Sequence, residues 1–303
     1  MDAGTGTGEK RVNLFVFGLG YSASYYVRTR STDYKQITAT VRSADKRDAL
    51  AREGVHAFVF SPTQIDDGLL EALANADRLL VSIPPSANGD PALARFSDAV
   101  AAAPRLRAIV YLSTIGVYGD HAGAWIDETT APVPSNERSV WRLAAEAGWR
   151  DVARRKGIAA HVLRLAGIYG PGQNALMNLR AGTAKRIIKK GQVFNRIHVE
   201  DIARATDAAF AFSDPHADRV WNVCDNEPAP PQDVVTYAAK LLRVEPPAEI
   251  DFATAELSPM ARSFYSECKR CSNRAMREEL GVALACPTYR EGIDQLHSLG
   301  DGR

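Results

Sequence analysis

Cysteine is scarce in this chain, and its placement argues against a disulfide-based fold. Only four cysteines occur among 303 residues, and all of them follow residue 220. A secreted disulfide scaffold needs paired cysteines spread along the chain, so we expect free thiols and an intracellular, cytoplasmic protein. Cys268 and Cys271 have a metal-like spacing, but no second cysteine pair or histidine pair completes four ligands, so no metal site is expected.

The sequence also lacks a surplus of charge and a long apolar run. Its 37 basic and 36 acidic residues leave a formal net charge of +1, which provides no net field to attract nucleic acid or an anionic membrane. No stretch approaches the roughly 20 apolar residues that cross a bilayer. Residues 1–10 contain no apolar run and no Gly-Lys-Ser/Thr ending, so we expect a flexible tail there. A small molecule is the expected partner.

Short β-rich apolar runs alternate with helical segments along the chain. The pattern predicts strands at 11–17, 37–41, 55–60, 79–83, 108–113, 160–165 and 219–223. It predicts helices at 22–30, 44–53, 66–75, 91–103, 140–156 and 199–212. Such alternation is typical of parallel strands joined by crossover helices. The fold class expected is therefore α/β, a doubly wound parallel-sheet Rossmann fold.

The chain changes character near residue 227. Prolines gather at 228, 230, 231, 246 and 247, and the segments that follow have helical patterns with little strand signal. We expect a dinucleotide-binding Rossmann domain over 11–172 and 193–226. Residues 173–192 and 227–303 should form a smaller, mainly helical substrate lobe.

A glycine-rich turn follows the first expected strand and opens the first expected helix. It reads Gly18-Leu19-Gly20-Tyr21-Ser22-Ala23, a GxGxxA pattern in the context that a dinucleotide site requires. Gly18 allows the tight turn, Gly20 allows close approach of a diphosphate, and Ala23 keeps helix and strand close. The diphosphate would then lie on the free N–H groups at the helix start, including those of Tyr21 and Ser22.

The end of the second expected strand bears on the choice of coenzyme. An acidic residue there would bind the ribose 2′-hydroxyl of NAD. The chain instead has Val41-Arg42-Ser43, with Lys46 and Arg47 nearby. Because a guanidinium can pair with a 2′-phosphate, the sequence favours NADP(H) over NAD(H), with Arg42 and Ser43 as contacts.

Several segments, taken in order, resemble the extended short-chain dehydrogenase/reductases, the NAD-dependent epimerase/dehydratase group. They are YLSTIGVYGDHAGAWID at 111–127, LRLAGIYGPG at 163–172, RIHVEDIA at 196–203, WNV at 221–223 and PTYREGI at 287–293. The resemblance implies that a strand-end loop lines the coenzyme and that a second segment lies beside the nicotinamide. These two segments are Ser82, Ile83 and Pro84, and Ala166, Gly167, Ile168 and Tyr169.

The same resemblance implies a reaction centre of Ser/Thr, Tyr and Lys, and here the chain departs from the family. Thr114 matches the Ser/Thr, four residues before Tyr118. Aligning Arg142 with the lysine, four residues before Glu146, puts Arg138 at the tyrosine. The i,i+4 spacing keeps both arginines on one helix face. A guanidinium cannot exchange a proton at neutral pH, so Arg142 can replace the lysine's charge but Arg138 cannot replace the tyrosine.

Two functions therefore stay open. The first is an atypical NADP-dependent oxidoreductase or epimerase acting on a small polar substrate, with Thr114 holding the substrate oxygen. Arg138 and Arg142 would form its pocket for an anionic group. The second is a non-catalytic, dinucleotide-sensing binding or regulatory protein. The resemblance also implies a homodimer through the helices near 91–103 and 138–156. Asp127 and Glu128 are expected in an exposed turn, and His198 at a helix start as a cap or in solvent.

Overall fold

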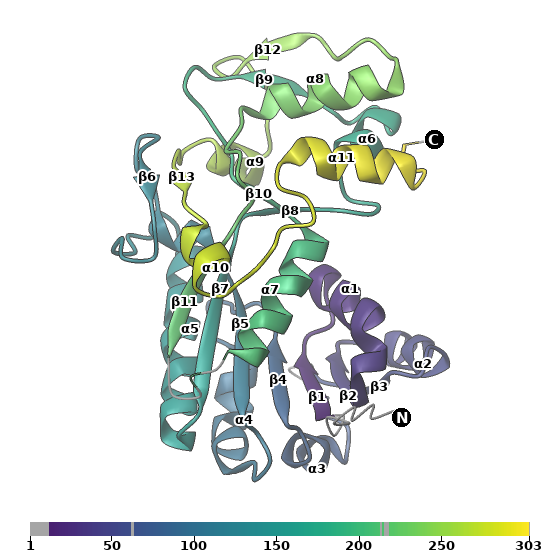
Figure 1. Ribbon diagram of the computed structural model, residues 1–303, viewed down its shortest axis with the longest axis vertical. Coiled ribbons are helices and arrows are strands. Elements are labelled where there is room, and N and C mark those ends of the chain that lie inside the picture. Colours follow the sequence, from purple (N-terminus) through teal and green to yellow (C-terminus); the bar gives the residue numbers. More distant parts are fainter. Residues whose placement is uncertain (1–11, 62–63, 213, 215–217, 303) are drawn as a thin grey trace, which may run out of the picture.

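The computed structural model describes residues 12–61, 64–212, 214 and 218–302. The tail at 1–10 and Arg11, where we expected the first strand to start, lie outside this part. Within it, seven parallel strands form one sheet in the order β3–β2–β1–β4–β5–β7–β11 (Figure 1). The strands of this sheet are β1 (Val12–Phe17), β2 (Tyr34–Val41), β3 (His56–Val59), β4 (Arg78–Val81), β5 (Ala108–Thr114), β7 (Ala159–Leu165) and β11 (Arg219–Val223).

Helices cover both faces of the sheet, because successive residues of a strand point to opposite faces. Leu14 and Val16 of β1 belong to one core, while Phe15 and Phe17 belong to the other. Helices α1 (Tyr21–Arg30) and α7 (Val199–Ala211) pack on the first core, and α2 (Ala44–Arg52) and α10 (Arg274–Glu278) contribute side chains to it. Helices α3 (Leu69–Ala74), α4 (Pro91–Ala102) and α5 (Glu137–Lys156) pack on the second. The expected doubly wound α/β fold is confirmed.

The direction of the strand order reverses between β1 and β4, which pair side by side although β2 and β3 separate them in the chain. The connections from these two strands leave toward opposite sides of the sheet. A crevice opens at such a point outside the carboxyl ends of the strands, and ligands of open α/β sheets bind there.

A second lobe lies above these carboxyl ends in Figure 1. It contains α6 (Ala175–Arg180), α8 (Pro231–Leu242), α9 (Pro259–Phe264) and α11 (Tyr289–Ser298). Three short strand pairs accompany the helices: β8 (Gly167–Tyr169) with β10 (Arg196–His198), β9 (Arg186–Ile188) with β12 (Glu249–Asp251), and β6 (Trp125–Ile126) with β13 (Arg270–Cys271). Strands of two or three residues carry no readable alternation, which is why the sequence did not indicate them.

Two helices begin three residues away from the start that the sequence predicts. Helix α5 begins at Glu137 and not at 140, because the side chain of Asn136 caps it by accepting the N–H of Ser139 at 3.0 Å. Arg138 is therefore inside the helix. Helix α3 begins at Leu69 and not at 66, because the carboxylate of Asp66 instead accepts a hydrogen bond from the N–H of Val59 at 2.7 Å.

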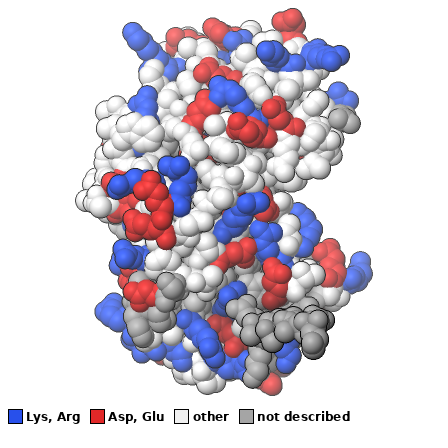
Figure 2. Space-filling model, in the orientation of Figure 1, with Lys and Arg blue, Asp and Glu red and all other residues white. Residues whose placement is uncertain are grey.

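The surface carries both signs of charge. Figure 2 shows basic and acidic side chains interspersed over one face, as the near-zero net charge suggests. The outline in this view is notched at its right edge, between α11 above and α1 below (Figures 1 and 2). None of the described helices combines the length and the apolar character that a membrane crossing requires.

Candidate functional site

Glycine at position 18 lets the turn after β1 form without strain. Gly18 has φ +83°, and a Cβ there would lie 2.8 Å from the backbone N of Ile83. Its N–H donates to Oγ1 of Thr40 at 2.9 Å. The N–H groups of Ser82 and Ile83 both donate to the carbonyl of Phe17, at 2.8 and 3.0 Å. The turn after β1 and the loop after β4 are thus fastened together at the crevice.

Helix α1 starts at this turn with its N-terminal amides uncapped. Gly20 is the N-cap residue, is exposed, and has nothing within 4 Å of the place a Cβ would occupy. No side chain caps the helix and no acidic residue lies in its first turn. The N–H groups of Tyr21, Ser22 and Ala23 have no partner within the helix. An open space before a bare helix start is the geometry that holds a diphosphate, so these residues fit a dinucleotide.

The end of β2 presents one basic side chain that is free to bind. Arg42 is exposed and makes no hydrogen bond or ion pair with any described residue. Arg47 is already paired with Asp48 and Asp66, at 2.9 and 3.3 Å. Lys46 donates to the carbonyl of Leu19 at 2.5 Å, which ties helix α2 to the glycine turn. Ser43 caps α2 by accepting the N–H of Lys46.

The loops after β4 and β7 approach the same edge of the sheet. Ser82 and Ile83 are half-buried and Pro84 is exposed. After β7, Ala166 is buried, Gly167 is exposed and Ile168 is half-buried. The N–H of Gly167 donates to the carbonyl of Asn195 at 3.0 Å, and the hydroxyl of Tyr21 donates to the carbonyl of Pro171 at 3.1 Å. These contacts join the start of α1 to the segment beyond β7.

Tyr169 and His198 point into the second lobe. The rings pack edge to face with centroids 5.2 Å apart, and the Tyr169 hydroxyl donates to the carbonyl of Thr288. His198 is 2% exposed and caps α7 by accepting the N–H of Glu200 at 3.3 Å. The prediction that His198 caps a helix is therefore confirmed, and the alternative that His198 is exposed to solvent is wrong. Burial lowers the pKa of His198 to about 4, so the ring is neutral at pH 7.

Thr114 lies at the end of β5, beside the start of α5. It is half-buried, and its Oγ1 accepts the N–H of Gly116 at 3.0 Å, capping the short 3-10 helix η2 (Ile115–Tyr118). A Cβ on Gly116 would lie 3.1 Å from Oγ of Ser139, so this buried hydroxyl packs against the same turn. Sequence reasoning did not single out Ser139, although it directly follows the position aligned with the tyrosine.

The two arginines of α5 have different surroundings. Arg142 is half-buried, and its Nη1 donates to the hydroxyl of Tyr111 at 3.2 Å and to the carbonyl of Leu112 at 3.0 Å. Arg138 lies one turn earlier, is exposed, and has no hydrogen bond or ion pair with the described part of the chain. The structure therefore brings Arg142 against Tyr111 and Leu112 of β5, while Arg138 stays open to solvent.

Neither nearby phenol is placed to substitute for the missing tyrosine. Tyr118 is fully buried, with its hydroxyl donating to Oδ1 of Asn222 at 2.8 Å, and burial raises its pKa to about 12. Tyr111 is 1% exposed, and burial raises its pKa further still, although the Arg142 guanidinium opposes the shift. Both hydroxyls are engaged inside the protein.

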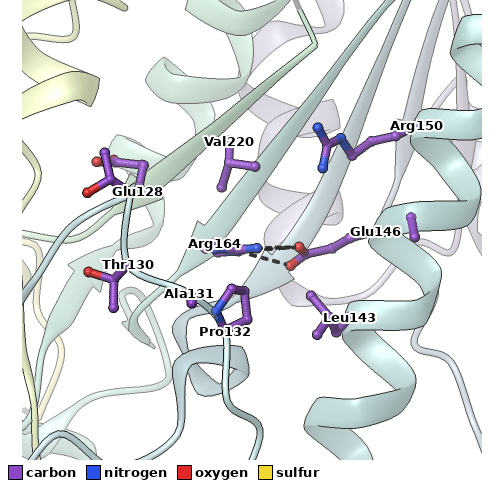
Figure 3. A pocket seen from close by; sticks show the side chains of 11 residues that line it. Glu128, Thr130, Ala131, Pro132, Leu143, Glu146, Arg150, Arg164 and Val220 are labelled. Atoms are coloured by element: carbon purple, nitrogen blue, oxygen red, sulfur yellow. Dashed lines mark hydrogen bonds and ion pairs between the residues drawn. The ribbon is translucent and has the colours of Figure 1, made fainter.

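A buried ion pair supports this end of the site. Arg164 of β7 and Glu146 of α5 are 5% and 3% exposed, with Nη2 and Oε2 2.7 Å apart (Figure 3). Glu146 also accepts a hydrogen bond from the Ser113 hydroxyl, next to Thr114. In the sequence analysis, Glu146 was used only to align Arg138 and Arg142 with the tyrosine and lysine of the family. Its partner could not be named, because no local pattern connects residues 146 and 164.

The turn expected at Asp127 and Glu128 is present, but both residues are half-buried and not exposed. The Glu128 carboxylate accepts the N–H of Asn222 at 2.7 Å. Burial raises its pKa above the ordinary value. Asn222 is 94 residues away along the chain, which is why a local turn pattern could not reveal the contact.

Comparisons with known proteins agree with this geometry. A sequence model of the NAD dependent epimerase/dehydratase family matches residues 94–224. Protein YeeZ of Escherichia coli strain K12 is 29% identical over 245 residues, which cover 77% of this chain and 84% of YeeZ. A functionally unknown conserved protein from Silicibacter pomeroyi has a structure with a TM-score of 0.86 and 45% identity, covering 96% of this chain and 99% of that protein.

More distant structures share the fold alone. UDP-glucuronic acid 4-epimerase from Bacillus cereus, solved in complex with UDP-glucuronic acid and NAD, has a TM-score of 0.73 at 16% identity, over 95% of this chain and 99% of the epimerase. The seven-stranded parallel sheet and the glycine turn after its first strand define a Rossmann-like α/β fold. The part of the chain that matches the NAD dependent epimerase/dehydratase family is the segment 94–224, which contains β5, α5, β7 and β11.

Proposed function

We propose that the protein binds NADP(H) in preference to NAD(H). The observation that carries the preference is the free guanidinium of Arg42 at the end of β2, where no carboxylate is present to accept a ribose 2′-hydroxyl. Arg42 has no internal partner among the described residues to give up, so pairing with a 2′-phosphate costs no existing ion pair. The hydroxyl of Ser43 lies beside it.

Calorimetric titration of NADPH and NADH tests this preference. Arg42→Ala should weaken NADPH binding about 10- to 100-fold, as expected for a charged hydrogen-bonded pair worth about 1.5–3 kcal/mol, and should change NADH binding less than about twofold. Arg52→Ala is the matched control, since Arg52 is an exposed arginine at the opposite end of α2. Equal weakening of both coenzymes by Arg42→Ala would remove Arg42 from this role.

We further propose that the bound coenzyme serves redox or isomerisation chemistry on a small polar substrate. A nicotinamide bound along this edge supplies a hydride donor or acceptor. Thr114 would orient the substrate oxygen with its hydroxyl. Arg142, anchored at the end of β5, and the exposed Arg138 would together bind an anionic group of the substrate. The proton would come from a group other than the family's tyrosine.

One observation favours a second candidate, a non-catalytic dinucleotide-sensing protein. Arg138 stands at the position of the proton donor, and a guanidinium keeps its proton at neutral pH. The nearby phenols Tyr111 and Tyr118 are buried and already hydrogen-bonded. A protein with this arrangement can bind coenzyme and change its affinity for a partner without turning over a substrate.

Two measurements separate the candidates. NADPH is mixed with the protein and a panel of aldehydes, ketones and sugar nucleotides, and the loss of nicotinamide absorbance is followed. Turnover supports the enzyme, whereas tight NADPH binding without turnover supports the sensor. Arg138→Tyr should then introduce or raise carbonyl reduction, because it restores an acidic hydroxyl one helical turn from Arg142. Arg138→Phe, which adds the ring without the hydroxyl, should not. Equal behaviour of the two folded, coenzyme-binding variants would contradict the alignment of α5.

A further inference from the structure

The chain beyond α11 turns back and is held in the second lobe. The N–H of Asp301 donates to the carbonyl of Leu296 at 3.0 Å, which closes the turn after the helix. Gly302 is buried, and a Cβ on it would lie 3.0 Å from Cβ of Leu176 in α6 and 3.2 Å from Cδ2 of Leu242 in α8. The Asp301 carboxylate is therefore carried on a fixed piece of backbone.

This carboxylate holds the loop at 170–174. Oδ2 of Asp301 accepts the N–H of Gly172 at 2.9 Å and the side-chain amide of Asn174 at 2.6 Å. Asn174 is 6% exposed, and the same amide also donates to the carbonyl of Gly170 at 2.9 Å. Hydrogen bonds to an ionised acceptor are stronger than those between neutral groups. One carboxylate from the end of the chain thus fixes the loop.

The same loop also touches the start of α1. The hydroxyl of Tyr21 donates to the carbonyl of Pro171 at 3.1 Å. A Cβ on Gly170 would lie 2.6 Å from this hydroxyl, so the glycine leaves room for the phenol. Burial raises the pKa of Tyr21 to about 12, and the carboxylate of Asp301 acts in the same direction. The phenol is therefore protonated at neutral pH and can donate to the loop.

Tyr21 connects this loop to the coenzyme turn. It is the first residue of α1, and its N–H is one of the free amides at the helix start. Its N–H is thus open to a diphosphate, while its hydroxyl is bound to the loop. Helices α1 and α11 lie on the two sides of the notch in Figures 1 and 2, and the contacts through Tyr21, Pro171 and Asp301 join these two sides.

We propose that Asp301 is a positioning residue for the coenzyme and that the loop at 170–174 couples coenzyme binding to the second lobe. Asp301 keeps the carbonyl of Pro171 where the Tyr21 hydroxyl meets it, and this bond holds the first residue of α1 in place for the diphosphate. A site that is ordered in advance loses less conformational entropy on binding and therefore binds more tightly. The inference rests on the proposed coenzyme binding, but it does not depend on the choice between NADP(H) and NAD(H).

Calorimetric titration of the full chain with NADPH tests the coupling. Asp301→Ala and Tyr21→Phe should each weaken NADPH binding at least about fivefold, the lower end of typical couplings between two sites. The double variant should bind NADPH about as weakly as the weaker single variant, because both substitutions interrupt the same series of contacts.

Two matched substitutions serve as controls. Asp294→Ala removes an exposed carboxylate of α11 that accepts the hydroxyl of Tyr237, away from the loop. Tyr25→Phe removes a hydroxyl one turn further along α1. Both controls should bind NADPH as tightly as the wild type.

Hydrogen exchange tests the reciprocal effect. Since coupling between two sites acts equally in both directions, NADPH should slow amide exchange in the segment 296–302 of the wild type. In Tyr21→Phe, which keeps the ring, this protection should be lost even at saturating NADPH. A purely structural role of Asp301 would leave the protection in Tyr21→Phe unchanged.

The outcomes separate this inference from the coenzyme proposal. Wild-type NADPH affinity in Asp301→Ala and Tyr21→Phe, or a double variant that loses the sum of the two single effects, would overturn the coupling. If Asp301→Ala lowers the thermal midpoint, Tyr21→Phe carries the test alone. Binding of neither NADPH nor NADH to the wild type would refute the coenzyme site and the coupling with it, whereas equal binding of both would refute only the preference for NADP(H).

Discussion

The two glycines of the turn after β1 should respond differently to the same methyl group. Gly18→Ala places a Cβ 2.8 Å from the backbone N of Ile83, at a φ of +83°. Gly20→Ala places a Cβ in open space, at a φ of −81° that any residue adopts. The first substitution therefore tests the stability of the turn, and the second tests whether the turn binds the diphosphate of the coenzyme.

The expected magnitudes follow from these surroundings. An L-residue in the left-handed region costs about 1–2 kcal/mol, and the contact with Ile83 requires a backbone shift in addition, so we expect Gly18→Ala to lower the free energy of unfolding by about 3 kcal/mol. Gly20→Ala should change it by less than about 1 kcal/mol, because a poorer N-cap is partly offset by a less flexible unfolded chain. Gly54→Ala measures the backbone strain alone, since Gly54 has φ +77° and a Cβ on it would have no atom within 4 Å.

Urea denaturation and NADPH titration together measure the two effects. Gly20→Ala should unfold at the wild-type urea concentration yet bind NADPH at least about tenfold more weakly, because its methyl group occupies the approach to the helix start. Gly18→Ala should be less stable than Gly54→Ala by the cost of the contact with Ile83. Wild-type NADPH affinity in Gly20→Ala would refute the assignment of the turn to the diphosphate.

Two further predictions concern buried charge. Burial raises the pKa of Asp225 to about 7 from its ordinary 3.8, so the folded state holds this proton more tightly than the unfolded state and loses stability as pH rises through that interval. In urea unfolding, the free energy of unfolding of Asp225→Asn should therefore rise by about 2–3 kcal/mol relative to that of the wild type between pH 5 and pH 8. A difference between the two proteins that does not change with pH would contradict this reasoning. Glu146→Gln should lower the free energy of unfolding by about 3–5 kcal/mol, because it leaves the buried charge of Arg164 without a partner. Adding Arg164→Met should recover much of this loss in the same assay. A loss below about 1 kcal/mol in Glu146→Gln would show that the ion pair is not needed for stability.

Local sequence patterns were sufficient where the structure is local. The short apolar runs of the strands and the approximate positions of the sheet helices were readable, and so was the glycine turn. The start of α5 was missed because Asn136 caps the helix ahead of its apolar pattern. The short strands outside the main sheet were missed because two or three residues show no periodicity.

The sequence by itself determined the parallel sheet and the glycine turn. The sheet follows from the alternation of strand and helix segments, and the turn follows from the residue spacing within one segment. Only the tertiary structure decided which charges are free. Arg42 and Arg47 look alike in sequence, yet Asp66 neutralises only Arg47. Glu128 and Asp127 are neighbours, yet only Glu128 accepts a hydrogen bond from the distant Asn222. Whether a charge is satisfied depends on partners that folding brings from distant positions, and residue spacing alone does not contain that information.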